Sequence, residues 1–130
     1  MIKLIFSRLI ITVLACFLLI GCIPPRVIIT PDKLPDAIIG MPYSAEIKID
    51  GGSGPIGGFE NIIYPEHCGL KIIFPEVNGV VESNYMRIQG TPVVKQEISV
   101  SLKGFMIPTG WNDSSSYKKI YIIKVKEAEK

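Results

Sequence analysis

Three cysteines and one histidine are the side chains of this sequence best suited to nucleophilic or metal chemistry. His67 and Cys68 are neighbours, and neighbours on an extended strand point to opposite faces, so a thiolate and an imidazole placed there are poorly set to act as a pair. One histidine and one thiol also fall short of the three or four ligands of a zinc site. We therefore predict a buried or idle thiol at Cys68, no catalytic residue and no metal site.

The first 20 residues have the pattern of a targeting segment. Lys3 and Arg8 give it a basic start, and residues 9 to 20 form a run that is apolar except for Thr12. Such a run is short for a transmembrane helix, which needs about 20 apolar residues, but it fits the roughly 7 to 15 of a secretory signal. The segment is therefore predicted to be a signal peptide.

Cys22 has a setting that points to lipid attachment. The sequence Leu19-Ile20-Gly21-Cys22 resembles the bacterial lipobox, whose cysteine is diacylated before cleavage. The resemblance implies that residues 1 to 21 are removed, that Cys22 becomes a lipidated N-terminus with enough acyl chains for stable anchoring, and that residues 22 to 26 form a tether. The next residue, Ile23, is not the aspartate that favours inner-membrane retention, so the outer membrane is implied if the organism is Gram-negative. An uncleaved anchor helix, or an ordinary signal cut elsewhere, is the alternative.

Composition limits what the remaining chain can be. Loss of residues 1 to 21 from the 130 would leave 109, enough for one modest core. The 14 basic residues become 12 without Lys3 and Arg8, against 12 acidic ones. A balanced charge gives no clustered basic face for nucleic acid, and no cofactor motif is present. Cys16 leaves with the signal and Cys22 carries lipid, so Cys68 has no disulfide partner.

Glycine and acidic residues suggest two further kinds of site, and neither is supported. The stretch GGSGPIGG at residues 51 to 58 lacks the Lys-Ser/Thr pair of a phosphate-binding loop, so we predict an inter-strand loop there. Calcium ligation would need acidic residues in a loop of the Asp-x-Asp type, and none of the acidic candidates belongs to such a loop; they are Asp32, Asp36, Asp50 and Glu60. No carboxylate stands in a context typical of glycoside hydrolysis. We expect a protein that is not an enzyme.

The loop at residues 107 to 116 is long and polar, and it holds the only tryptophan, Trp111, followed by Asn112. Binding loops of β-sandwiches have this composition, so Trp111 and Asn112 are candidates for a partner-binding or membrane-facing loop. The alternative is that Trp111 folds back to cap the core. A tether of about five residues spans at most roughly 16 to 18 Å. We therefore expect residues 51 to 58 and Trp111 to face the lipid headgroups, at the end where the first strand begins.

Short runs rich in Ile, Val and Tyr, separated by Gly and Pro, predict an all-β fold. Alternation of apolar and polar residues is clearest at residues 43 to 50 and 97 to 103, and it is less clean at 121 to 126. Weaker candidates lie at 26 to 30, 59 to 64, 70 to 74 and 85 to 89. About seven strands is the number expected of a small sandwich.

The segments LPDAIIGMPYSAEIKIDGGSGP (34 to 55), MRIQGTPV (86 to 93) and EISVSLKG (97 to 104) carry a family resemblance. With the Gly69-Leu70 pair, they resemble the Ig-domain repeat of bacterial surface proteins, which is related to dystroglycan-type cadherin-like domains. The resemblance implies a single Ig-like or cadherin-like β-sandwich over residues 27 to 127. The sequence departs from the family pattern between residues 65 and 84.

Together these features predict a lipid-anchored protein of the bacterial cell envelope that acts as a non-enzymatic binding or scaffolding module. Its expected partners are the membrane, through the N-terminal lipid, and an envelope protein. One alternative is an immunity or exclusion lipoprotein that neutralises a toxin or a phage at the membrane. An alternative of another class is an accessory to an envelope enzyme, or a small hydrolase. Fold alone does not separate these functions.

Overall fold

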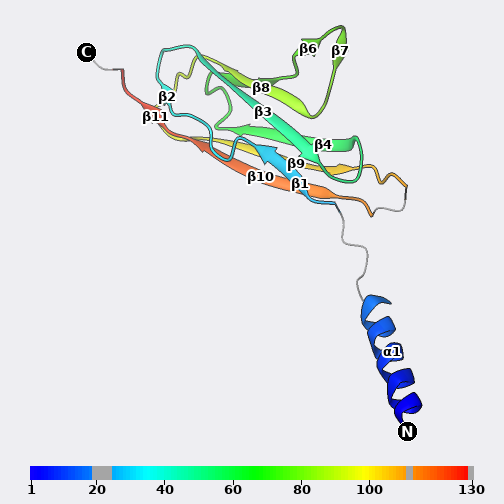
Figure 1. Cartoon of the computed structure of the whole chain (residues 1–130). Helices are drawn as coiled ribbons and strands as arrows, with labels where there is room; N and C mark the ends of the chain where they lie inside the picture. Colours follow the sequence, from blue (N-terminus) through cyan, green and yellow to red (C-terminus); the bar gives the residue numbers. More distant parts are fainter. Residues whose placement is uncertain (19–24, 111–112, 129–130) are drawn as a thin grey trace.

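The computed structural model describes residues 1 to 18, 25 to 110 and 113 to 128 (Figure 1). Its one described helix, α1 (Ile2–Leu18), covers most of the apolar N-terminal run, and residues 2 to 17 are exposed. Figure 1 shows α1 apart from the strands. Among the described residues, no helix has the length and apolar character needed to cross a membrane.

Seven strands form two antiparallel sheets that pack face to face. The four-stranded sheet has the order β1 (Val27–Thr30), β3 (Tyr43–Gly51), β8 (Tyr85–Gly90) and β5 (Leu70–Ile73). The three-stranded sheet has the order β10 (Ser116–Ile123), β9 (Ile98–Met106) and β4 (Ile56–Tyr64). This is the strand order of a seven-stranded immunoglobulin-type sandwich, so the predicted all-β fold is confirmed.

The chain changes sheets between its first two strands. After β1 has paired with β3, the short strand β2 (Ala37–Ile38) pairs in parallel with β11 (Val125–Lys126), which follows β10. Two tyrosines hold the connecting segment. The Tyr43 hydroxyl donates to the carbonyl of Pro35 at 2.8 Å, and the Tyr121 hydroxyl donates to the carbonyl of Pro31.

The core lies between the two sheets and is built by strict alternation. In β3 every second residue from Tyr43 to Ile49 is buried, and in β9 the buried residues begin at Ile98 and include Met106. Branched and flexible apolar side chains with no more than 2% of their surface exposed fill the centre, among them Ile47, Ile49, Met86, Ile88, Ile98, Val100, Leu102, Met106 and Ile123. Burial of one such side chain is worth about 1.5 to 3 kcal/mol.

Two strands begin earlier than the sequence predicts. Strand β4 starts at Ile56, so the interpretation of residues 51 to 58 as a loop is wrong for its last three residues. Gly58 pairs with Phe105 of β9 and Gly57 lies at an irregularity in the pairing, and the Phe105 ring packs against both glycines in place of side chains. Strand β10 starts at Ser116, five residues before Tyr121, and its inward Tyr117 anchors this added length in the core.

The stretch that departs from the family pattern contains a hairpin that was not predicted. Strands β6 (Glu76–Val77) and β7 (Val80–Val81) pair across Asn78 and Gly79, whose φ angles are 53° and 79°. Positive φ at both central residues is the requirement of the tight hairpin turn that Asn-Gly favours. Figure 1 shows this hairpin projecting from the sandwich.

The turn between β4 and β5 separates the histidine from the thiol. His67 is exposed with φ at 59°, whereas Cys68 is 1% exposed and its Sγ lies 3.9 Å from the carbonyl oxygen of Leu70. The two side chains therefore face different environments, as predicted, although they lie in a turn and not on a strand. Cys68 is part of the core.

Candidate binding face

The outer surface of the three-stranded sheet is built from alternate residues of β4, β9 and β10. Two cross-strand rows form its centre, Ile62, Ser101 and Ile120 in one and Tyr64, Ser99 and Ile122 in the other. Small serines thus run along the middle strand, and large apolar side chains stand on both flanking strands. The residues that alternate with them along each strand point into the core, so the side chains of these two rows point away from the sandwich.

Five large apolar side chains of this surface are exposed, and we call them the apolar face. Their exposed fractions run from 48% to 65%, and they are Ile62, Tyr64, Phe105, Ile120 and Ile122. Scattered apolar residues are normal on a protein surface, but four of these five side chains lie in two adjacent cross-strand rows, and a contiguous set of this kind is typical of an interaction site. The apolar face is thus the strongest candidate site in the described part of the chain.

The outer surface of the four-stranded sheet has a different character. The Arg87 guanidinium donates to Oε1 of Glu46 at 3.1 Å, and the two residues lie directly opposite each other on β8 and β3. Hydrogen bonds from Tyr85 and Arg87 lower the pKa of the Glu46 carboxyl. These polar side chains satisfy one another in the monomer, which is how a sheet surface that faces water is usually built.

A row of charges lies between Phe105 and the other four residues of the apolar face. Lys118, Lys103 and Glu60 lie directly opposite one another on β10, β9 and β4. All three are exposed, and none forms an ion pair with another described residue. Next to this row, a shallow hollow of about 390 Å³ opens between Phe105, Glu60 and Ser116. The border is therefore charged and has room for a side chain from a partner.

Hydrogen bonds gather two loops and the start of the first strand at one end of the sandwich. The buried Ser53 hydroxyl accepts the backbone N–H of Ser115 at 3.0 Å, and the Ser115 hydroxyl donates to the carbonyl of Pro25 at 2.7 Å. The Thr109 hydroxyl and N–H both donate to the carbonyl of Ser53. The structure therefore places the loop after β3 and the described residues of the loop after β9 beside Pro25, at the end of the sandwich where β1 begins, which we call the tether end.

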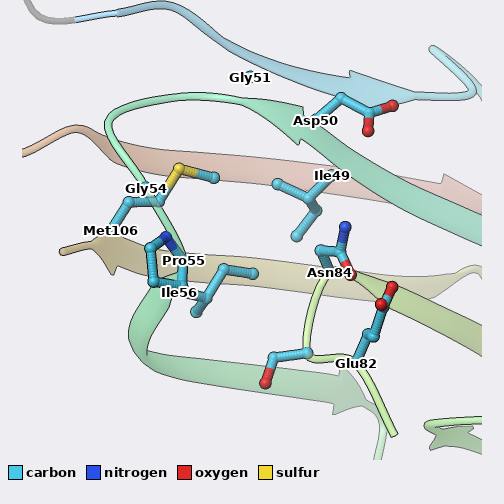
Figure 2. A pocket seen from close by; sticks show the side chains of 10 residues that line it. Ile49, Asp50, Gly51, Gly54, Pro55, Ile56, Glu82, Asn84 and Met106 are labelled. Atoms are coloured by element: carbon cyan, nitrogen blue, oxygen red, sulfur yellow. The ribbon is translucent and has the colours of Figure 1, made fainter. Parts of the chain in front are cut away.

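A second hollow, of about 400 Å³, lies at the same end between the sheets (Figure 2). Ile49, Ile56 and Met106 form its apolar floor, and the polar groups of Asp50, Glu82 and Asn84 stand at its rim. Asp50 lies 3.8 Å from the Lys48 ammonium, and both side chains are about half exposed. Two solvated carboxylates over an open hollow do not make the enclosed acid-base pair that catalysis needs.

The structure separates the acidic residues that were weighed as calcium ligands. Asp32 pairs with Lys119 at 3.1 Å and Asp36 with Lys126 at 3.0 Å. The described residues contain no group of three or more acidic, cysteine or histidine side chains that could hold a metal ion. The lipobox residues Leu19, Ile20, Gly21 and Cys22, and the loop residues Trp111 and Asn112, lie outside the described residues.

Sequence reasoning missed the apolar face, although one signal for it was present. Alternation along β10 is imperfect because Ile120 and Ile122 occupy positions where the polar phase is expected, and Ile62 does the same on β4. A single outward isoleucine carries no information. These isoleucines form one surface only because β4 and β10, which are more than 50 positions apart in sequence, pair with the two edges of β9.

Known proteins resemble this chain in fold. No protein-family model and no curated protein matches it, so the Ig-repeat resemblance rests on the motifs alone. The sialic acid binding region of an adhesin from Streptococcus sanguinis SK1, solved with 3'sLn bound, has a TM-score of 0.50 and 15% identity over 81% of this chain and 29% of that one. The SrpA adhesin of Streptococcus sanguinis has a TM-score of 0.48 and 17% identity, over 84% of this chain and 60% of that one.

These structural matches extend beyond the region that this chain covers, since the chain spans less than two thirds of either adhesin structure. At 15% identity the likeness to the SK1 region is a likeness of fold. The chain is therefore an immunoglobulin-type β-sandwich whose strand arrangement is similar to that of a bacterial adhesin binding region.

Proposed function

We propose that this chain is a lipid-anchored, non-enzymatic binding module of the bacterial cell envelope, and that it binds a protein through the apolar face. The observation that carries the proposal is the exposure of five large apolar side chains on the outer surface of one sheet, while the exposed residues on the outer surface of the other sheet are polar apart from Ile28. The lipobox resemblance at residues 19 to 22 supports the anchor. The fold likeness to an adhesin binding region supports a binding role.

A protein partner fits this surface better than a sugar. The SK1 adhesin region is a sialic acid binding region, and its structure holds 3'sLn. A sialylated glycan offers hydroxyls and a carboxylate, and it is bound by polar groups placed around it. The centre of the apolar face instead presents Ile62, Ile120 and Ile122 around two serines, which is the composition of a protein interface core.

Site-directed photo-crosslinking in living cells tests the proposal. A photoreactive amino acid replaces Ser101, at the centre of the apolar face, in the full-length chain. The matched control carries the same residue at Ser44, which is exposed on the outer surface of the other sheet. We expect protein adducts from position 101 and few or none from position 44. Equal labelling at the two positions, or no adduct at position 101, would contradict the proposal.

A second pair of variants checks that the contact is apolar. Ile122→Lys replaces a member of the apolar face, and Ile28→Lys replaces a similarly exposed isoleucine on β1 in the other sheet, with exposed fractions of 48% and 53%. Ile122→Lys is expected to remove the adducts formed from position 101, and Ile28→Lys is expected to leave them. Circular dichroism of both variants shows whether the fold is kept.

A further inference from the structure

We infer that the protein bound by the apolar face is a second copy of this chain, packed face to face about a two-fold axis that runs parallel to β9. The inference rests on the proposed function and names its partner. It follows from the order of side chains across the three strands and from the charges at the border. Homodimers with such isologous contacts are the most common protein assemblies.

The two-fold axis matches apolar side chains with apolar side chains. Rotation about β9 lays β10 of each copy over β4 of the other, at the same height along the strands. Ile120 would then meet Ile62 of the second copy, and Ile122 would meet Tyr64. Ser99 and Ser101 would lie on the axis, as would Lys103 and Phe105, and the two small serines let the middle strands approach each other at their end of β9.

The same rotation matches the charges at the border. Lys118 on β10 and Glu60 on β4 belong to one cross-strand row, with Lys103 between them. Rotation about β9 places Lys118 of each copy over Glu60 of the other, so two ion pairs form, while the Lys103 residues of the two copies come close to each other at the axis. None of these three side chains has an ion-pair partner among the described residues of its own chain. Charge pairs of this kind fix the register of an interface.

The other face-to-face arrangement is disfavoured by the same residues. A two-fold axis across the strands lays β10 over β10 in the opposite direction. With the axis at the row of Ser101, Lys118 would stand over Ile122 and Glu60 over Tyr64. Charged side chains would then be buried against apolar ones with no partner, which is strongly unfavourable. The charges therefore disfavour this placement, whereas the axis along β9 pairs Lys118 with Glu60.

The selected axis also agrees with anchoring in one membrane. The strands run from the tether end, where Pro25 meets Ser115, to the opposite end of the sandwich. An axis parallel to β9 keeps the tether ends of both copies on the same side. Two chains anchored through Cys22 in one leaflet can therefore reach each other without either sandwich turning over.

The experiment uses full-length chains with two different C-terminal tags, produced together in one cell. The photoreactive residue at Ser101 lies near the axis, so we expect an adduct that carries both tags, and we expect none from Ser44. Adducts of position 101 that contain only other proteins would overturn the inference and leave the proposed function intact. Absence of any adduct from position 101 would overturn both.

Exchange of the charges tests the arrangement, because a variant that had lost its fold would not recover when the second charge is reversed. Glu60→Lys alone and Lys118→Glu alone place like charges across the axis, and each should lower the doubly tagged adduct about tenfold. The combination of Glu60→Lys with Lys118→Glu restores opposite charges and should restore the adduct. Lys103→Gln removes two like charges near the axis and should raise the yield. Failure of the double variant to recover, when each single variant has lost the adduct, would overturn the two-fold arrangement.

Discussion

At the scale of single residues, the glycines of β9 and β4 show how sequence controls the shape of the sheet. Gly104 faces inward on β9, opposite Tyr117 on β10, and a Cβ there would clash with the Tyr117 hydroxyl oxygen. The Tyr117 ring therefore crosses the middle strand through a space that only glycine leaves open. The φ of Gly104 is not in the left-handed region. Glycine is therefore needed here for the close approach of Tyr117 and not for the backbone conformation.

The Gly104→Ala variant should lose stability because Tyr117 must move out of its place in the core. Overpacking of a core usually costs about 1 to 3 kcal/mol. Urea denaturation followed by circular dichroism would measure the free energy of unfolding. Ser101→Ala, on the outward side of the same strand, is the control and should change that free energy little. Equal stability of the two variants would show that Tyr117 does not pack across Gly104.

Two core tyrosines predict how stability changes at alkaline pH. Burial, with smaller contributions from Asp36 and Asp32 respectively, raises the pKa of Tyr43 and of Tyr121 to about 12, from an ordinary value of 10.0. Because the folded state favours the neutral phenols, their contribution is complete below pH 10 and is lost as the pH rises towards 12. We expect the free energy of unfolding to fall steeply in that interval.

Substitution of one phenol separates this effect from general alkaline damage. Tyr121→Phe removes the titrating group and the hydrogen bond to Pro31, so it should cost about 1 kcal/mol at neutral pH and make the fall above pH 10 shallower. Denaturant titrations at a series of pH values measure both quantities. An unchanged alkaline slope in Tyr121→Phe would contradict the assignment of the effect to this residue.

At the scale of elements, the strands that sequence predicts well are those with one buried and one solvated face. Strands β3 and β9 have clean alternation, and the structure confirms both. The starts of β4 and β10 were missed because glycines and serines are read as loop residues when the strand beside them is unknown. The Phe105 ring, distant in sequence, supplies the missing packing over Gly57 and Gly58 at the start of β4, and the buried Tyr117 anchors the start of β10.

The hairpin of β6 and β7 could have been found, since Asn78-Gly79 between valines is a strong local signal. Its valines, at positions 77, 80 and 81, are 55% to 59% exposed, so the hairpin adds little to the core. Replacement of residues 76 to 81 by two glycines should therefore change the free energy of unfolding by less than about 1 kcal/mol. Thermal denaturation would measure the change, and a large loss would show that the hairpin supports the core.

At the scale of the whole molecule, the anchor at Cys22 is a prediction from sequence, because residues 19 to 24 lie outside the described residues. Cys22→Ala removes the thiol that accepts lipid, so the variant should be released from membranes or should keep residues 1 to 21. Mass spectrometry of the N-terminal peptide measures both the cleavage and the acyl mass. A wild-type N-terminus without acyl mass would contradict the anchor.

The candidate site could not be predicted at this scale because it belongs to no single segment. Ile62 and Ile120 each look like ordinary strand residues, and they form one surface only after β4 and β10 have docked on either side of β9. Local patterns predict which face of a strand is buried. They do not predict which outward faces lie next to each other, since that depends on the sheet order.

The change of sheets by the first strands has a mechanical consequence. Strand β1 starts at the tether end, antiparallel to β3, and β2 pairs in parallel with β11 near the opposite end. A load applied at that opposite end and resisted at the tether would act along the strands. It would therefore shear the backbone hydrogen bonds of β1 with β3 together, instead of opening them one at a time. With the predicted anchor at Cys22, the sandwich would resist tension between a membrane and a load applied at its far end.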